Sequence, residues 1–560
     1  MQKLAKRIFL KYIYIMLAMW LCPIATFAQA LLWRGVMIDV SRHFMPLEDL
    51  RRQIDAMEHF GLNTLHLHLT DAAGWRLQIK SYPRLTDLGA WRTAPDWKTW
   101  WQGNRQYADS TTGYGGFYTQ DEMRELVRYA ARRGVNIVPE IEFPAHSEEV
   151  VAAYPELGFN HAEMGMQKEA VYTFMGHVLD EVCDIFPSHY LHLGGDEAAT
   201  QHDLQPMAMR RLKQMVEARG RRMVVWDEAL SEEPADSSMV IMVWRNIDTA
   251  KRAIELGHQV ILCPGKWCYL DKCQDDPTHE PKAAGGYLPI DSVYSLPHPI
   301  LGRGENSPAT LSSVMNSYTF SKSIGRIIGI QANLWTEHIE TPQYAEYMLW
   351  PRAFAIAELG KSGLDKPRNY KTFRKKALAA TRYLRDTLGI NAFPLDQEIG
   401  ERRERMKTIH SLCTHRPVQY LLPYHSYYPA AGDQTLTDGK RGGWNNTDGR
   451  WQGYIKGGMD VIIDLGKPRK ISSIMGDFLQ STGPEIFLPY TMKIEVSLDS
   501  VNWKQIHKET DIHSELPEDY QLLGWNVSSK KEKERARYIR LRALTGPRQG
   551  WVFCDEIIVK

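Results

Sequence analysis

Eight short apolar runs, separated by helical patterns, fill the chain between residues 32 and 360. Alternating strand and helix signals predict a parallel sheet whose strands are joined by helices. Segments such as 47–57 and 123–130 repeat apolar residues every three or four positions, which predicts helices with one apolar face toward the sheet. Eight units favour a closed (β/α)8 TIM barrel, with a doubly wound open sheet as the alternative. The expected strands are residues 35–40, 64–69, 136–141, 190–193, 223–226, 240–244, 259–262 and 327–333.

The sequence changes character after residue 389. Residues 391–426 contain the charged run Glu401-Arg402-Arg403-Glu404-Arg405, followed by loops without a clear period, so we expect a connector. From residue 427 to 560, short strand-like segments alternate with turns, which predicts an all-β sandwich. We therefore expect the barrel, as the catalytic domain, to span residues 31–390. The expected sandwich strands are residues 459–465, 493–498, 537–544 and 556–559.

The first thirty residues have the pattern of an export signal. Basic residues at positions 3, 6, 7 and 11 precede an apolar stretch over 12–21, and Ala28-Gln29-Ala30 supplies small residues for cleavage. The stretch is shorter than the roughly 20 residues that a bilayer-spanning helix needs. We expect residues 1–30 to be a signal peptide. The mature protein is then exported to the periplasm, the cell surface or the medium, with no transmembrane segment.

The chain contains seven cysteines. Cys22 lies in the expected signal, and the bulky residues before it disfavour its use as a lipid anchor. Cys263, Cys268 and Cys273 lie close enough in sequence for local disulfides in an exported protein, and buried free thiols are the alternative. Their regular spacing of five residues is not a zinc pattern.

The charges of the chain nearly cancel. Lys plus Arg total 68 and Asp plus Glu total 67, so there is no basic field to attract nucleic acid or an anionic membrane. A small neutral substrate is compatible with this balance. The 17 Trp and 26 Tyr supply flat apolar rings of the kind that suit the faces of sugars.

Polar residues follow the expected strands at the points where these strands end. Any one of them alone would be interpreted as the cap of the next helix. In a barrel, however, the carboxyl ends of all strands surround one pocket, where barrel enzymes carry their catalytic residues. We therefore expect these side chains to converge. In chain order they are Asp71, Glu142, His146, Asp196, Glu197, Trp226, Asp227, Glu228, Trp335 and Glu337.

Asp196 and Glu197 end the hexapeptide His192-Leu193-Gly194-Gly195-Asp196-Glu197. The two carboxylates of a glycosidase normally flank the scissile bond about 5 to 10 Å apart, which adjacent residues are poorly placed to do. We therefore expect one of them to assist a nucleophile that belongs to the substrate, such as the acetamido oxygen of a 2-acetamido sugar. Glu197 then protonates the leaving oxygen and later activates water. Asp196 holds the acetamido N–H and stabilises the oxazolinium-like intermediate.

Motifs along the whole barrel resemble the family 20 glycoside hydrolases, the β-N-acetylhexosaminidases, in the order of that family. Glu142 and Ala145 stand where the family usually has Asp and Gly. The motifs are RGVMIDVSRHF (34–44), LHLHLTD (65–71), GWR (74–76), GGFYT (115–119), PEIEFPAH (139–146), HLGGDE (192–197), WDE (226–228), WTE (335–337) and PRA (351–353).

The resemblance implies Glu197 as the acid/base, Asp196 as the residue that orients the acetamido group, and Tyr269 as the donor to its carbonyl oxygen. Trp226, Trp244 and Trp335 would wall the pocket. Arg34 and Glu337 would hold sugar hydroxyls, and Asp71 and His146 would support the acid/base. No catalytic metal or cofactor is implied. The implied substrate-binding residues are Arg34, Asp71, His146, Trp226, Trp244, Asp271, Trp335 and Glu337.

The C-terminal region resembles the discoidin or coagulation-factor C-type domain, a galactose-binding-like jelly roll. Such modules often bind sugars, and some hold a structural calcium ion near a loop like Thr437-Asp438-Gly439. A module that only packs against the barrel is the alternative. The matching segments are TDG (437–439), Trp444, VIIDLG (461–466), VSLD (496–499), Trp503, ARYIRL (536–541) and DEI (555–557).

These observations together predict an exo-acting, retaining β-N-acetylhexosaminidase that removes terminal GlcNAc or GalNAc from glycans. A related hydrolase of another 2-acetamido glycan, releasing a disaccharide or a sulfated sugar, is one alternative. A glycan-binding protein without catalysis is another, and the joint presence of Asp196, Glu197 and Tyr269 argues against it.

Overall fold

The computed structural model describes most of the chain from residue 30 onward. The expected signal peptide and the charged run 401–405 lie outside the described residues. The described ranges are 30–103, 105–198, 200–230, 239–299, 326–400, 407–482, 484–510, 512, 520–528, 534–547 and 550–560.

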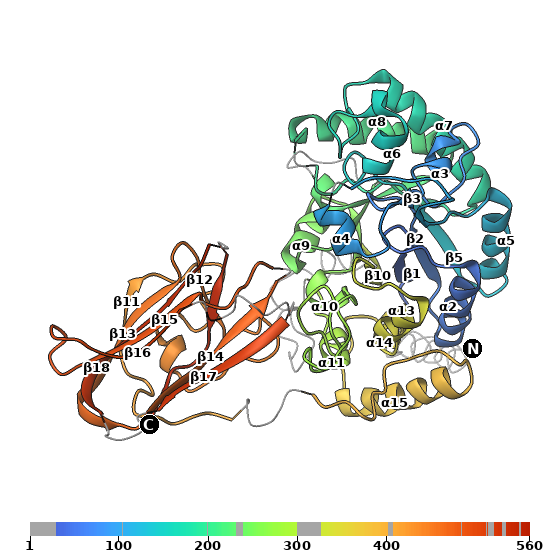
Figure 1. The fold of residues 1–560 in the computed structure, drawn as a ribbon. Coiled ribbons are helices and arrows are strands. Elements are labelled where there is room, and N and C mark those ends of the chain that lie inside the picture. Colours follow the sequence, from blue (N-terminus) through green and yellow to red (C-terminus); the bar gives the residue numbers. More distant parts are fainter. Residues whose placement is uncertain are drawn as a thin grey trace, which may run out of the picture.

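Eight parallel strands close into a barrel within the described part of the chain (Figure 1). The order around the barrel is β1-β10-β9-β8-β7-β6-β5-β2, and β2 pairs with β1 to complete the ring. Each strand lies within two residues of its expected bounds, so the TIM-barrel prediction is confirmed. The strands are β1 (Trp33–Asp39), β2 (Thr64–His68), β5 (Asn136–Glu140), β6 (Tyr190–His192), β7 (Arg222–Trp226), β8 (Val240–Val243), β9 (Gln259–Leu262) and β10 (Ile327–Leu334).

Amphipathic helices cover the outside of the barrel and bury their apolar faces on it. In α5, for example, Met123, Leu126 and Val127 are buried, and Thr119 and Glu122 form a capping box that fixes where the helix begins. The outermost helix, α15, packs on α14. These helices are α2 (Leu47–Phe60), α5 (Gln120–Ala131), α7 (Glu169–Ile185), α8 (Gln205–Glu217), α9 (Ile247–Glu255), α13 (Pro342–Leu349), α14 (Arg352–Ser362) and α15 (Tyr370–Asp386).

The connection between β2 and β5 is long and covers part of the carboxyl-end face of the barrel (Figure 1). Buried Arg76 ties it down, because its guanidinium donates to the carbonyls of Ser41, Ala90 and Gly116. Shorter elements also follow β5 and β9 on this face. The short elements are α3 (Arg84–Asp87), β3 (Trp91–Arg92), α4 (Trp97–Gln102), β4 (Tyr114–Gly115), α6 (Glu148–Ala153), α10 (Gly265–Cys268) and α11 (Ile290–Tyr294).

The C-terminal region is a sandwich of two antiparallel sheets, as expected for a discoidin-like module. One sheet has the order β11-β13-β18-β15-β16, and the other β12-β19-β14-β17 with β20 beside β14. Apolar residues on the facing sides, such as Ile463, Phe478 and Leu541, form the core. The strands are β11 (Val418–Leu422), β12 (Gln452–Tyr454), β13 (Met459–Ile471), β14 (Ser473–Ser481), β15 (Thr491–Ser497), β16 (Lys504–Thr510), β17 (Tyr520–Ser528), β18 (Glu534–Leu544), β19 (Val552–Cys554) and β20 (Ile558–Val559).

One strand corrects the expected boundary of the sandwich. β11 lies inside residues 391–426, which the sequence analysis treats as a connector, yet it pairs with β13 along the edge of the first sheet. Val418 and Tyr420 pack against the sandwich core while Gln419 and Leu421 are exposed, but this alternation covers only five residues and ends in the apolar pair Leu421-Leu422, which makes it a weak strand signal.

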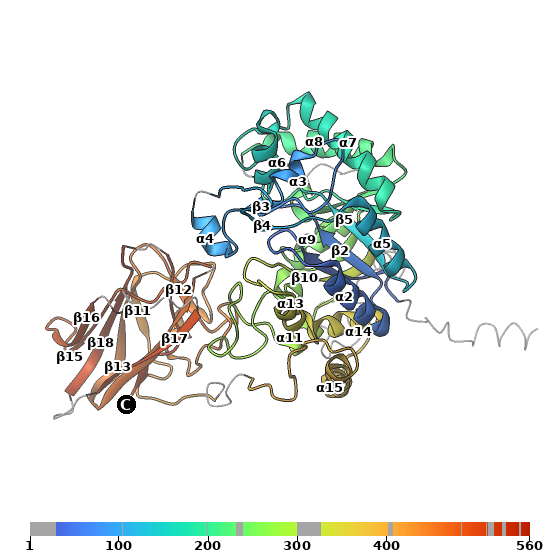
Figure 2. The same cartoon turned by 45° about the vertical axis from the view of Figure 1, so that its right-hand side comes forward.

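The sandwich lies beside the barrel near α10 and α11 (Figures 1 and 2). Trp444 of the sandwich meets Tyr287 of the barrel edge-on, with ring centroids 5.3 Å apart. The connecting segment is held to the barrel by Asp275, whose carboxylate accepts from the backbone N–H groups of Ile399 and Gly400.

The described cysteines settle the question of local disulfides. All six of them, including Cys263, Cys268 and Cys273, are free thiols. Among the described residues, no helix combines the length and the apolar character that crossing a membrane requires.

Candidate active site

The structure brings the predicted residues together at the carboxyl ends of the barrel strands, with one exception. The segments that follow β2, β5 and β6 supply the charged residues on one side, and those at the ends of β7 to β10 supply aromatic rings and acids on the other. The exception is Arg34. The converging residues are Asp71, His146, Asp196, Glu197, Trp226, Trp244, Tyr269, Asp271, Trp335 and Glu337.

Asp71, His146 and Glu197 form a line. The Nδ1 atom of His146 lies 3.4 Å from Asp71 Oδ2, and its Nε2 atom lies 3.4 Å from Glu197 Oε2. Burial would lower the pKa of His146, but the carboxylates of Asp71, Glu197 and Asp196 outweigh burial and raise it well above its ordinary value. The carboxylates around His146 therefore favour its protonated form. Its hydrogen bond to Glu197 is the main reason that the pKa of Glu197 is lowered.

A tight turn gives the two adjacent acids different surroundings. Gly194, Gly195 and Glu197 have φ values of 44°, 95° and 50°, and a side chain at Gly194 would collide with the carboxylate of Glu142. The turn buries the Asp196 side chain to 13% exposure and leaves that of Glu197 62% exposed. Burial, reinforced by nearby carboxylates, raises the pKa of Asp196 to about 6. The Nε2 atom of His146 is only 3.8 Å from Asp196 Oδ2, so both acids face the same imidazole.

Aromatic rings form the opposite wall. Trp335 has its ring centroid 6.0 Å from that of Trp226 and 5.9 Å from that of Tyr269, and Tyr269 stacks on Trp244 at 6.0 Å. Glu228, which the sequence analysis places on the rim without a role, accepts a 2.8 Å hydrogen bond from Trp244 Nε1 and so orients that ring. Burial raises the pKa of the Tyr269 phenol well above its ordinary value, which keeps its proton available for donation.

Several buried polar atoms around the pocket have no hydrogen-bond partner among the described residues. They include Asp196 Oδ1, Asp271 Oδ1, Trp226 Nε1 and Trp335 Nε1. Buried polar atoms in native proteins are nearly always hydrogen-bonded. Several unpartnered donors and acceptors around one pocket therefore indicate a polar ligand that both donates and accepts hydrogen bonds. An acetamido sugar has both functions.

Arg34 is not part of the site, and its predicted role is wrong. It lies at the amino end of β1, where its guanidinium donates to the backbone carbonyls of Leu31 and Gly61. Arg42, which follows β1, occupies the expected position instead. It lies 2.7 Å from Asp71 and 3.8 Å from Glu337, and its guanidinium stands 5.0 Å from the centre of the Trp335 ring. The rule that barrel sites form at carboxyl ends of strands would have selected Arg42.

Glu337 lies beside Arg42 at the edge of the pocket. Burial raises the pKa of Glu337 to about 7 even though Arg42 opposes the shift. A partly protonated carboxyl of this kind can both donate to and accept from sugar hydroxyls.

A second layer of charge lies beneath the site, inside the barrel. Glu140 contacts three imidazoles: its Oε2 atom lies 2.6 Å from His68 Nδ1 and 3.2 Å from His66 Nε2, and its Oε1 atom lies 2.9 Å from His192 Nδ1. His68 Nε2 continues to Asp71 Oδ2 at 3.0 Å. No sequence pattern predicts this layer, because its histidines stand within apolar strand runs.

This buried layer also contains the described groups whose atoms lie close enough to share a metal ion. One group is His66, Glu140 and His192, and the other is His68, Glu140 and Glu142, each with its ligand atoms within 4.8 Å of one another. Glu140 is already paired with all three imidazoles, so the geometry is equally that of a hydrogen-bonded charge network.

Comparison with known proteins agrees with the fold. The chain is 35% identical over 403 residues to a β-hexosaminidase of Porphyromonas gingivalis, covering 66% of this chain and 48% of that protein. It is 34% identical over 368 residues to a β-hexosaminidase of Vibrio furnissii, covering 60% of this chain and 56% of that one. The chain thus spans about half the length of the curated relatives it matches.

Solved structures and domain families give the same assignment. A GH20 exo β-N-acetylglucosaminidase from Vibrio harveyi, solved with N-acetylglucosamine, superposes with a TM-score of 0.56 at 30% identity, covering 65% of this chain and 59% of that one. Residues 423–557 match the F5/8 type C domain. Residues 32–363 match the catalytic domain of glycosyl hydrolase family 20, and the chain therefore belongs to that family.

Proposed function

We propose that this protein is an exo-acting β-N-acetylhexosaminidase that removes terminal GlcNAc or GalNAc from glycans with retention of configuration. One observation carries the proposal: Asp196 and Glu197 lie within 3.8 and 3.4 Å of the same nitrogen of His146. Two carboxylates on one side of a pocket do not flank a glycosidic bond as acid and nucleophile. The nucleophile then belongs to the substrate, which requires a 2-acetamido group.

The first step breaks the glycosidic bond. The acetamido oxygen attacks the anomeric carbon, the leaving oxygen departs with a proton from Glu197, and a cyclic oxazolinium ion forms. The proton of the His146–Glu197 pair is favoured on His146 in the free protein, because the pKa of His146 is raised and that of Glu197 is lowered. Transfer across the 3.4 Å contact supplies Glu197 with the proton that it gives to the leaving group.

Asp196 and Tyr269 act on the acetamido group during this step. The Asp196 carboxylate accepts the acetamido N–H and stabilises the positive charge that develops on nitrogen. The buried Tyr269 phenol donates to the acetamido oxygen and aligns it. Trp226, Trp244 and Trp335 enclose the methyl group and the ring face, where they exclude water.

The second step restores the sugar. Water attacks the anomeric carbon from the side that the aglycone has left, Glu197 takes a proton from this water, and the oxazolinium ring opens. Two inversions at one carbon give net retention.

The reaction is tested with three nitrophenyl glycosides. We expect rapid hydrolysis of the β-GlcNAc or β-GalNAc substrate and almost none of the β-glucoside, because the glucoside lacks the acetamido nucleophile. Equal rates on the glucoside contradict the mechanism. Release of nitrophenol and a free, intact disaccharide from a fourth substrate, a nitrophenyl β-glycoside of an acetamido disaccharide, with no action on the monosaccharide glycosides, would instead identify the disaccharide-releasing alternative.

We also propose a structural calcium ion in the sandwich. Glu556 is buried, and its Oε2 atom accepts from Gly439 N at 3.0 Å, whereas Oε1 has no hydrogen-bond partner within the described residues. Burial, together with Asp438, raises the pKa of Glu556 to about 9. An unpartnered carboxylate oxygen beside a second acid fits a hard cation, which Glu556 and Asp438 would hold.

Thermal unfolding tests the calcium site without reference to activity. We expect calcium to raise the melting temperature of the sandwich relative to a chelator, and this difference to vanish in Glu556→Gln. An unchanged melting temperature contradicts the site.

Export is a separate proposal: the N-terminus of the mature protein, read by mass spectrometry, is expected near Leu31.

A further inference from the structure

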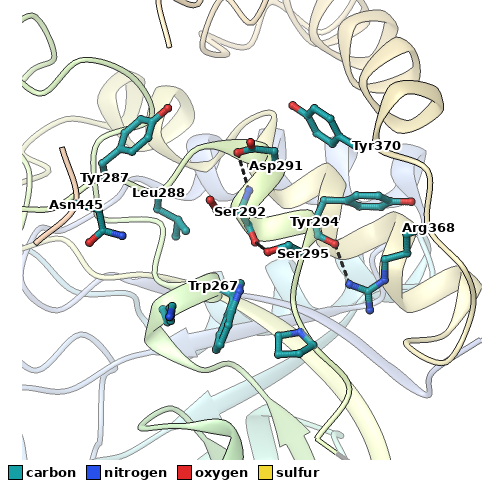
Figure 3. Close-up of a pocket in the computed structure, with 12 residues that line it drawn as sticks. Trp267, Tyr287, Leu288, Asp291, Ser292, Tyr294, Ser295, Arg368, Tyr370 and Asn445 are labelled. Carbon is teal, nitrogen blue, oxygen red and sulfur yellow. Dashed lines mark hydrogen bonds between the residues drawn. The ribbon is translucent and has the colours of Figure 1, made fainter. Parts of the chain in front are cut away.

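A cavity of about 410 Å³ lies between the barrel and the sandwich, apart from the catalytic residues (Figure 3). α10, α11 and the start of α15 form its barrel side, and Asn445 reaches it from the sandwich. Pockets for small ligands usually measure about 300 to 1,000 Å³, so the cavity has room for one or two sugar rings.

The lining combines flat rings with hydrogen-bonding groups. Trp267, Tyr287 and Tyr370 supply aromatic surface, and Asp291, Ser292 and Asn445 supply polar atoms. The Oδ1 atom of Asn445 accepts from the N–H and the hydroxyl of Thr447, at 3.0 and 2.9 Å. These bonds hold the side chain with its amide nitrogen toward the cavity (Figure 3).

The charges at the cavity favour a neutral ligand. Arg368 is committed to the backbone, because it donates to the carbonyls of Tyr294 at 2.9 Å and Leu296 at 2.6 Å. It is therefore a structural cation and not a clamp for sulfate or phosphate. Lys266 and Asp291, which also line the cavity, carry opposite charges, so neither an anion nor a cation is strongly favoured there. Aromatic faces beside neutral hydrogen-bonding groups are suited to a pyranose.

The cavity is joined to the catalytic pocket by one short segment. Trp267 lines the cavity, and Tyr269, two residues later, stacks on Trp244 in the catalytic pocket. The segment 267–269 therefore contributes one aromatic ring to each of the two sites.

We propose that this cavity is a second sugar-binding site, shared by the two domains, which holds a remote unit of the glycan under hydrolysis. The inference rests on the proposed function, because it takes the glycan to be the substrate. The sandwich then contributes Asn445 directly to substrate binding.

Two variants test the site. Asn445→Ala removes the amide, and Ser292→Trp fills the cavity. Asn502→Ala is the matched control, because Asn502 also holds a sandwich turn, through a 2.8 Å bond to Asp499, but lies between β15 and β16 and does not line the cavity. Each is assayed on nitrophenyl β-GlcNAc and on a neutral tetrasaccharide with a terminal β-GlcNAc.

We expect Asn445→Ala to raise the KM for the tetrasaccharide about five-fold, the loss typical of one hydrogen bond, and Ser292→Trp to raise it further. The KM for the nitrophenyl substrate should not change in either cavity variant. Asn502→Ala should leave the KM for both substrates unchanged. An unchanged tetrasaccharide KM in both cavity variants overturns the proposal.

Binding separates this inference from the proposed function. Calorimetry of the tetrasaccharide on Glu197→Gln protein, with and without Asn445→Ala, should give the same five-fold loss of affinity in the absence of turnover. If no 2-acetamido glycoside is hydrolysed, the proposed function fails, and this titration still decides the cavity. If the Glu197→Gln protein does not bind the tetrasaccharide, or binds it equally well with and without Asn445→Ala, the proposed cavity site is overturned.

Discussion

His146 Nε2 lies 3.4 Å from Glu197 Oε2, close enough for the two side chains to form an ion pair. Asp71 fixes the other ring nitrogen at 3.4 Å, so the imidazole has a single useful orientation. Glu197 is the more exposed partner of this pair, and His146 is the more buried one.

Removal of the acid/base should reduce turnover according to the leaving group. We expect Glu197→Gln to lower kcat on nitrophenyl β-GlcNAc by about 10² to 10⁴, the usual share of general acid–base catalysis. A dinitrophenyl substrate, whose leaving group needs less protonation, should lose much less in its first step. Burst and steady-state kinetics measure both. Equal losses on the two substrates would contradict the assignment.

The pH profile should report Asp196. Its pKa is raised to about 6 by burial, and the mechanism needs its ionised form. Lowering the pH through 6 protonates the carboxyl and removes the charge that stabilises the intermediate, so kcat/KM should fall about ten-fold per pH unit below that value. In Asp196→Asn, kcat/KM should be much lower at every pH, and its decline below pH 6 should disappear. If the decline persists in the variant, another group causes it.

Arg42 and Arg34 should give opposite results. Arg42 is buried among three carboxylates, so Arg42→Ala leaves buried charge unpaired and should cost about 3 to 5 kcal/mol of stability, with loss of activity. Arg42→Lys keeps the charge but not the fork of donors, and should fold with a raised KM. Arg34→Ala should leave kcat and KM unchanged. A raised KM in Arg34→Ala would restore its predicted role.

The buried Glu140 should matter for stability and its pH dependence. Glu140 and Asp71 outweigh burial and raise the pKa of His68 to about 10. The stabilisation from His68 is therefore complete below its unfolded pKa of about 6.5 and is lost as the pH rises toward 10.

Glu140→Gln should cost about 3 to 5 kcal/mol and flatten this decline between pH 7 and 10. Denaturant unfolding across this range measures both effects. Glu58→Gln, an exposed acid paired with Arg133, is the control and should change little. A slope that survives in Glu140→Gln would assign the pH dependence to other groups.

The barrel could be predicted because its strands are buried on both sides and appear in the sequence as continuous apolar runs. The rim could be predicted because polar residues interrupt these runs at one consistent end. His66, His68 and His192 could not, since a polar residue inside an apolar run has no signal of its own until the barrel places three of them around Glu140. Arg34 was chosen from a motif against the position rule, and the position rule selects Arg42.

The pairing of β11 with β13 determines where the two domains can be separated. Cutting the chain at residue 426, where its composition changes, would strip the sandwich of an edge strand and expose the backbone N–H and C=O groups of β13. Unpaired edges of this kind invite association between molecules. A fragment that begins before residue 418 keeps β11 as its edge strand and is the one to express alone.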